Sequence, residues 1–223
     1  LNYQRNVAHE FLRMYYMMEK ISRDINNFDA DVQKEYRDYY SAFTEKYQFT
    51  PTQYSFLLFW ELSIYYSDVN GLIYDTMWRN VEKVYGKMKE KELINKVIGA
   101  LSQQVKDYAT WASESENQEW DFSKFFEFPF IKDGKGNYIS VCDITLSNAF
   151  FEKIFWLIRD CYPKDDSRAM AFFGRLFEKY IQNLTQEATK GSYSYIEEFA
   201  YGKNNKKSSD AYIRKDNNFL VIE

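Results

Sequence analysis

Cysteine, histidine, proline and glycine are all scarce in this sequence, and each shortage excludes or favours a class of protein. The 223 residues include 2 cysteines, 1 histidine, 3 prolines and 8 glycines. Cys142 and Cys161 form no C-x-x-C pair, and His9 is far from both in the sequence. The spacing therefore excludes a zinc site and a Cys/His or Ser/His/Asp catalytic set, and it favours reduced cytosolic thiols over disulfides. The shortage of proline and glycine favours a mainly helical protein.

Long apolar runs and excess positive charge are also lacking. The most apolar run, Phe56–Trp60, is too short to cross a bilayer, and no basic segment precedes a cleavable apolar one. We therefore expect a soluble, cytoplasmic protein. The net charge of −4 gives no global signal for nucleic acid. The acidic excess lies before Tyr162, with 19 Lys/Arg and 24 Asp/Glu, whereas the remainder has 10 and 9.

Apolar residues recur at helical spacing through residues 1–118 and predict a helical domain. The expected helices cover about 7–25, 32–47, 50–68 and 72–111, with Gly86 and Gly99 as possible interruptions of the last. In the third helix, Thr50 is placed as the N-cap and Gln53 completes a capping box. Because the apolar runs are short and broken, an antiparallel bundle is favoured over a coiled coil.

A second segment, residues 119–163, begins after the polar stretch 112–118. Residues 128–141 predict a β-hairpin, and residues 146–159 predict a buried helix that Pro163 ends. The turn contains Gly134 and Gly136, but their spacing fits neither a P-loop nor the G-x-G-x-x-G fingerprint. A plain hairpin turn is therefore the preferred interpretation.

The third segment, residues 164–223, changes from helix to strand. Asp165 or Asp166 is placed to cap a helix over 167–189, and Gly191 stops it. A strand over 193–201 and a basic loop follow. Two short strands, 210–213 and 219–222, are then joined by a turn that contains Asp-Asn-Asn.

Three short motifs in this segment resemble the PD-(D/E)XK nuclease superfamily. They are G-x-x-F-E at 174–178 on the helix, S-D-A-Y-I at 209–213, and F-L-V-I-E at 219–223, in the order that the superfamily has. The resemblance covers about the last quarter of the chain. It implies a mainly α protein with a small α+β C-terminal part: a helical bundle, a hairpin and helix, and an incomplete α-β-β-β nuclease core. The lysine that the motif has two residues after its glutamate would lie beyond Glu223.

The resemblance also implies a metal-dependent active site. Asp210 and Glu223 are the expected ligands of Mg²⁺ or Mn²⁺, and Glu178 completes the acidic cluster. Gly174, one turn before Glu178, would allow another backbone to approach the helix. Lys203, Lys206 and Lys207 are expected to contact the nucleic-acid backbone. Taken singly, each of these residues is more often a solvated structural residue, and only their joint order favours a site.

Two functions follow from these motifs. The first is a fragment of a Mg²⁺-dependent nuclease that hydrolyses phosphodiester bonds, in DNA, with a bacterial restriction or phage-defence role by analogy with the superfamily. In it, the helical domain senses a trigger, binds a protein partner, oligomerises or positions the substrate, and this chain as given is expected to be inactive. The alternative is a non-enzymatic interaction module whose C-terminal hairpin is a structural or degenerate nuclease remnant.

Overall fold

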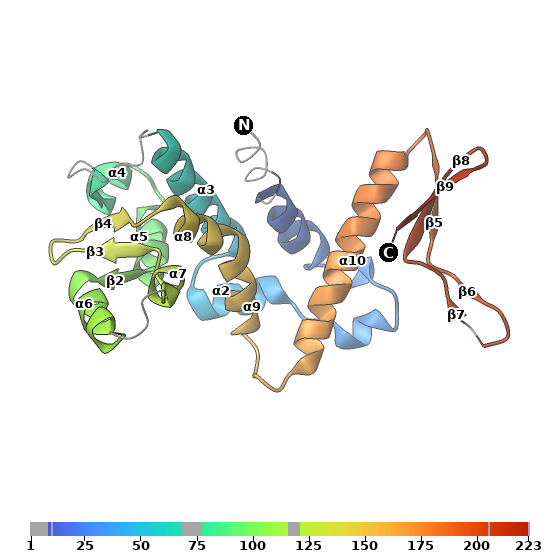
Figure 1. Cartoon of the computed structure of the whole chain (residues 1–223), viewed down its shortest axis with the longest axis horizontal. Coiled ribbons are helices and arrows are strands. Elements are labelled where there is room, and N and C mark those ends of the chain that lie inside the picture. The colour runs from blue at the N-terminus through green and yellow to red at the C-terminus, as the bar shows by residue number, and fades with distance from the viewer. Residues whose placement is uncertain (1–8, 10, 68–76, 116–120, 205, 223) are drawn as a thin grey trace.

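The computed structural model describes residue 9 and residues 11–67, 77–115, 121–204 and 206–222. Helices make up most of this chain and small β-sheets complete it, which confirms the mainly α class with some β structure (Figure 1). Residues 11–15 are helical. The first elements after them are η1 (Tyr16–Ile21), η2 (Ile25–Asn27), η3 (Val32–Glu35), α2 (Tyr39–Tyr47) and α3 (Pro51–Ser67).

The middle of the chain alternates short helices with short strands. Its elements are β1 (Arg79–Asn80), α4 (Val81–Tyr85), α5 (Lys91–Ala100), β2 (Ser102–Gln104), α6 (Val105–Glu114), α7 (Ser123–Glu127), β3 (Phe130–Lys132), β4 (Asn137–Ser140), α8 (Asp143–Asn148), η5 (Ala149–Lys153) and α9 (Ile154–Arg159). The C-terminal part contains α10 (Ser167–Thr189), β5 (Ser194–Glu197), β6 (Ala200–Tyr201), β7 (Lys206–Lys207), β8 (Ala211–Lys215) and β9 (Asn218–Ile222). Among the described residues, no helix is long and apolar enough to cross a membrane.

Two predicted helix starts are confirmed by their side-chain contacts. The backbone N–H of Gln53 donates to Thr50 Oγ1 at 3.1 Å, and the N–H of Thr50 donates to Gln53 Oε1 at 2.9 Å. This reciprocal pair is the capping box that the sequence predicts for α3. At α10 the cap is Asp166, whose carboxylate accepts from the backbone N–H groups of Arg168 and Ala169.

The prediction of one long helix over 72–111 is wrong in the part that the structure describes. Asn80 caps α4 by accepting from Glu82 N, and α4 ends at Tyr85, with Gly86 as its C-cap. A Cβ atom at Gly86 would lie 2.2 Å from the carbonyl oxygen of Glu82, so only glycine fits there. After α5 the chain is extended over β2, because this strand pairs with β3 in parallel. Sheet pairing with distant residues therefore overrides the helical periodicity.

One sheet joins the segments that the sequence analysis assigns to different domains. Its strand order is β1-β4-β3-β2, so a hairpin from residues 130–140 lies between strands from residues 79–80 and 102–104. The buried hydrophobic residues also form a cluster that runs from Met14 to Leu176. Residues 1–118 and 119–163 therefore share a core, and part of α10 belongs to it as well.

Helix α10 links this core to the C-terminal strands. On one side, Phe172 is fully buried, and its ring lies 4.9 Å from that of Phe28 and 5.3 Å from those of Tyr36 and Tyr39. On the other side stands a separate three-stranded sheet of order β5-β8-β9. Figure 1 shows this sheet beyond α10, at the end of the molecule opposite to α4, α5 and α6. The β6–β7 hairpin extends from it.

The Asp166 cap gives the fold a measurable pH dependence. Partial burial opposes ionisation, but the hydrogen bond from Ala169 N and the nearby charge of Arg37 lower the pKa of the Asp166 carboxyl below its ordinary value. A lowered pKa stabilises the fold above the unfolded value of about 3.9, and this stability is lost as the pH falls through the folded pKa. We expect Asp166→Asn to lower the unfolding midpoint in urea at neutral pH, and the difference from wild type to shrink as the pH falls through the lowered pKa of the folded state.

A matched control for this prediction is Asp165→Asn. Asp165 is exposed, and no side-chain contact is seen for it among the described residues. Its replacement should therefore leave the midpoint unchanged across the same pH range. A difference for Asp166→Asn that persists at acid pH would show that the carboxylate charge is not what stabilises the N-terminus of α10.

Candidate functional site

The C-terminal hairpin forms as its turn chemistry predicts. Strands β8 and β9 pair antiparallel from Lys215 opposite Asn218 to Ala211 opposite Ile222. The turn residue Asp216 has a φ of 54°, a left-handed conformation that aspartate tolerates better than most residues. Strand β5 pairs with the other edge of β8, so β8 is central. Asp210 comes directly before this central strand.

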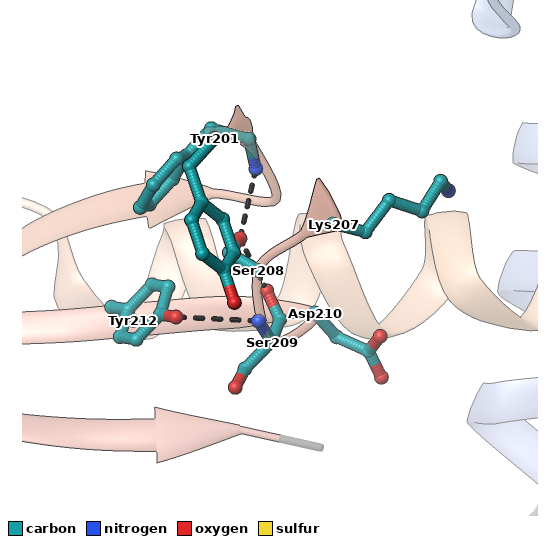
Figure 2. Close-up of a pocket in the computed structure, with 7 residues that line it drawn as sticks. Tyr201, Lys207, Ser208, Ser209, Asp210 and Tyr212 are labelled. Carbon is teal, nitrogen blue, oxygen red and sulfur yellow. Dashed lines mark hydrogen bonds between the residues drawn. The ribbon is translucent and has the colours of Figure 1, made fainter. Parts of the chain in front are cut away.

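Asp210 lies in an open groove between the β6–β7 hairpin and the start of β8. The groove has a volume of about 690 Å³, and three aromatic residues, two serines, Lys207 and Asp210 line it. In Figure 2, the rings of Tyr201 and Tyr212 lie on one side of the Ser208–Ser209 segment, and the side chains of Lys207 and Asp210 extend to the other side. The groove therefore has an aromatic end and a charged end.

Hydrogen bonds fix the walls of this groove. Phe199 and Ser208 are joined twice: Phe199 N donates to Ser208 Oγ, and Ser208 N donates to Phe199 O, both at 2.9 Å. Ser208 Oγ also donates to the carbonyl of Ser209 at 3.0 Å. The backbone N–H of Ser209 donates to the hydroxyl of Tyr212 at 3.2 Å, which ties the loop to β8 (Figure 2).

The three lysines that are predicted to contact phosphate are all exposed, and they belong to the β6–β7 hairpin. Lys206 and Lys207 form β7, and Lys203 lies in the turn that precedes it. Lys207 Nζ pairs with Glu198 at 3.0 Å. Lys203 and Lys206 make no ion pair with any residue that the structure describes. This hairpin therefore presents positive charge beside Asp210.

Glu178, the third predicted acidic residue, is exposed on α10. Its carboxylate pairs with Arg175 one turn earlier, at 2.9 Å. The expectation that Gly174 allows a close backbone approach is wrong for the described part of the chain, since a Cβ atom there would meet no atom within 4 Å. The helical G-x-x-F-E motif is thus present, but its glycine has no packing role here.

The acid that α10 does hold against the sheet is Glu197 at the end of β5. The side-chain amides of Gln182 and Gln186 donate to Glu197 Oε1 at 2.7 Å and 2.9 Å. These glutamines lie one and two turns beyond Glu178, so all three residues share one stripe of the helix. Glu197 is not among the site residues predicted from the sequence; the glutamines spaced four residues apart and the Glu197-Glu198 pair are the signals that point to it.

The Tyr195 hydroxyl is affected by the charges of both Glu197 and Asp210. Burial is the main reason that the pKa of Tyr195 is raised, and the negative charges of Glu197 and Asp210 raise it further. The hydroxyl therefore keeps its proton at neutral pH. Tyr195 lies on β5 opposite Ile213 of β8.

The described residues do not by themselves make a metal centre. Within them, no group of three or more His, Cys, Asp or Glu side chains is close enough to hold an ion. Glu223, the second predicted ligand, lies outside the described residues, so the convergence of Glu178, Asp210 and Glu223 stays a prediction. Of the three, the structure shows Asp210 in the groove and Glu178 in an exposed ion pair.

Comparison of the chain with known protein families, with curated proteins and with solved structures finds no match.

Proposed function

We propose that the chain carries the first part of the core of a metal-dependent nuclease that hydrolyses phosphodiester bonds, with DNA as the expected substrate. The observation that supports this most is the order of elements: helix α10, then a three-stranded antiparallel sheet with Asp210 at the start of its central strand. The PD-(D/E)XK resemblance implies this order. A role in bacterial restriction or phage defence rests on analogy with the superfamily.

The proposed site brings its acids together through strand register. The described pairing of β8 and β9 ends at Ala211 opposite Ile222. Continuing that register by one residue would set Asp210 against position 223, where the second acid stands in the sequence. Two carboxylates at adjacent strand ends would hold a divalent cation, which when bound supplies charge neutralisation and an activated water.

The residues of the chain itself would bind and orient the substrate. Lys203 and Lys206 are free to contact phosphates on the hairpin side of the groove, and Lys207 can exchange its pairing with Glu198 for a phosphate. The negative charge of Asp210 repels a phosphate unless a cation lies between them. We therefore expect the phosphate to approach Asp210 only when a divalent cation is bound there.

The exposed side chains of strand β9 support the proposal that the nuclease core has further elements that cover this strand. Phe219, Leu220 and Val221 are 57 %, 60 % and 50 % exposed, so this edge strand presents apolar side chains on both faces. Exposed apolar edge strands are usually covered or paired. The superfamily core covers the corresponding strand with a further helix and strand, and its lysine follows the glutamate by two residues.

The alternative function, an interaction module with a degenerate nuclease remnant, draws on the same exposed strand. In that interpretation β9 pairs with a strand of a protein partner instead of with its own core. The residue two positions after Glu223 in the natural gene separates the two functions. A lysine, glutamine or glutamate there favours the nuclease, and an apolar residue favours the interaction module.

A cleavage assay tests the proposal directly. We expect the 223-residue chain to leave supercoiled plasmid intact in Mg²⁺ or Mn²⁺, and the natural protein extended past Glu223 to nick it. Catalytic groups need positioning to a fraction of an ångström, which the expected lysine and covering elements would supply. Chelation by EDTA should stop the reaction. Cleavage by the shorter chain would place the chemistry elsewhere in the molecule.

Nucleic-acid binding is expected to depend on the three hairpin lysines. Replacing Lys203, Lys206 and Lys207 by alanine should weaken DNA binding. It should also reduce the slope of log K against log salt by about 0.7 to 0.9 for each lysine that contacts a phosphate. The measurement is fluorescence anisotropy over a salt series in EDTA, so that no cleavage intervenes.

The matched control replaces Lys83, Lys87 and Lys89 by alanine. These three lysines are also exposed, and they lie in and after α4, at the opposite end of the molecule in Figure 1. The control makes the same change of charge and should leave the slope unchanged. If it instead removes the salt dependence, the nucleic-acid interface lies on the helical body.

A further inference from the structure

The aromatic end of the groove is exposed and lies beside polar side chains. Tyr39, Tyr54, Tyr138, Phe43 and Phe130 are fully buried in the core. Phe199 and Tyr201, by contrast, are 48 % and 51 % exposed on the β6–β7 hairpin. Exposed large apolar groups clustered beside polar ones are typical of binding sites. Other exposed rings occur in the chain, but these two line one groove together with polar and charged side chains, so we consider what ligand they would fit.

The three rings form a connected surface with space beside it. The centroid of Phe199 lies 6.4 Å from that of Tyr201 and 5.8 Å from that of Tyr212. They line the groove of about 690 Å³, a volume within the range of small-molecule pockets. A planar aromatic ligand can stack on such rings, since offset and edge contacts between rings are favourable at these separations.

The loop that carries these rings is held in place before any ligand binds. Ser208 bonds to both the N–H and the carbonyl of Phe199, and Ser209 bonds to the Tyr212 hydroxyl. A preorganised wall loses less conformational entropy on binding than a mobile loop does. The groove is thus a formed feature of the hairpin.

The charges at the other end select the kind of planar ligand. Lys207 lines the groove, and Lys203 and Lys206 lie on the same hairpin, so these lysines favour a ligand that carries negative charge as well as a ring. A ring system attached to a phosphate is the chemical unit of a nucleic-acid strand. Bases inside a continuous duplex are stacked on each other and do not expose their faces, whereas unpaired bases do.

We infer that this groove binds an unpaired nucleotide, with its base against Phe199 and Tyr201 and its phosphate beside Lys207. The preferred ligand is therefore single-stranded nucleic acid or an unpaired end or flap, rather than continuous duplex. That the bound strand is also the strand that is cut rests on the proposed nuclease function. That the groove binds an unpaired nucleotide rests on the groove alone.

The test measures binding of fluorescein-labelled oligonucleotides by anisotropy in EDTA. The ligands are a single DNA strand, the same strand as a duplex, and an RNA strand of the same sequence. We expect either single strand to bind more tightly than the duplex, and the tighter of the two identifies DNA or RNA as the ligand. Replacing Phe199 and Tyr201 by leucine should weaken single-strand binding by about ten-fold or more for each ring that stacks, and should leave duplex binding unchanged.

Phe122→Leu is the matched control. Phe122 is 48 % exposed, as Phe199 is, and it lies just before α7 on the helical body. Its replacement should not change binding. Because Phe199 and Tyr201 are both exposed, the double variant should keep the wild-type circular dichroism spectrum and melting curve, which shows that folding is not the cause of any loss.

The outcomes separate this inference from the proposed function. Single-strand binding that depends on the two rings, in a full-length protein that cuts no substrate, supports the groove and contradicts the nuclease. Cleavage that is equally fast in wild type and in the double variant, with single strand and duplex bound alike, overturns the groove. Failure of the chain to bind any single strand also overturns it.

Discussion

Asp210→Asn is expected to abolish cleavage by the full-length protein and to leave its fold intact. The replacement removes the charge of the one predicted ligand that the structure shows in the groove, and it changes little in size or shape. Asp210 is exposed, so no core packing is lost. Changing residues that only support a metal ligand already costs about 10- to 100-fold in activity or affinity, so we expect a larger loss for the ligand itself. Plasmid nicking in Mg²⁺ measures it.

Asp216→Asn is the control for this prediction. Asp216 lies in the turn at the far end of the same hairpin, and asparagine tolerates its positive φ as well as aspartate does. This variant should cut at the wild-type rate. Full activity of the Asp210→Asn protein would refute the proposed site, because no role for that carboxylate in the reaction would remain.

Glu61→Ala is expected to have the largest effect on stability. Glu61 is fully buried on α3, and its Oε1 accepts from the hydroxyls of Tyr85 at 2.5 Å and Tyr138 at 2.9 Å. Its Oε2 accepts no hydrogen bond in the described structure and contacts Arg79 Nη2 as an ion pair at 2.9 Å. Removing the carboxylate leaves a mostly buried guanidinium and two buried hydroxyls without their acceptor. Losing one partner of a buried pair costs about 3–5 kcal/mol in the free energy of unfolding.

Urea unfolding followed by circular dichroism measures this loss. Glu61→Gln, which keeps an oxygen acceptor for the tyrosines but not the charge, should be destabilised by less than the alanine variant. The control is Glu187→Ala, which breaks an ion pair with Lys190 in which both side chains are 76 % exposed. Surface pairs contribute about 0–1 kcal/mol, so the control should unfold close to wild type. Equal effects in Glu61→Ala and Glu187→Ala would contradict the role of the buried network.

Local signals predicted the ends of elements well. Thr50 with Gln53 starts α3, Asp166 starts α10, and the Asp-Asn-Asn turn joins β8 to β9, as expected from the sequence. Each of these features depends on side chains that bond to backbone within a few residues. Such contacts are encoded in a short stretch of chain, so a single sequence is enough to recognise them.

Long-range pairing decided what the local signals did not. Residues 72–111 have helical periodicity, yet β1 and β2 form there because β4 and β3 offer them backbone partners. Likewise, only the packing of α10 on β5 shows that Gln182 and Gln186 hold Glu197. The aromatic groove forms only because the β6–β7 hairpin lies beside the start of β8.

The composition and the short motifs thus determined the mainly α class, the helix caps and the final hairpin. Which strands pair, which acid faces which helix and where rings gather depended on contacts between residues far apart in the chain, whose energies no local pattern records.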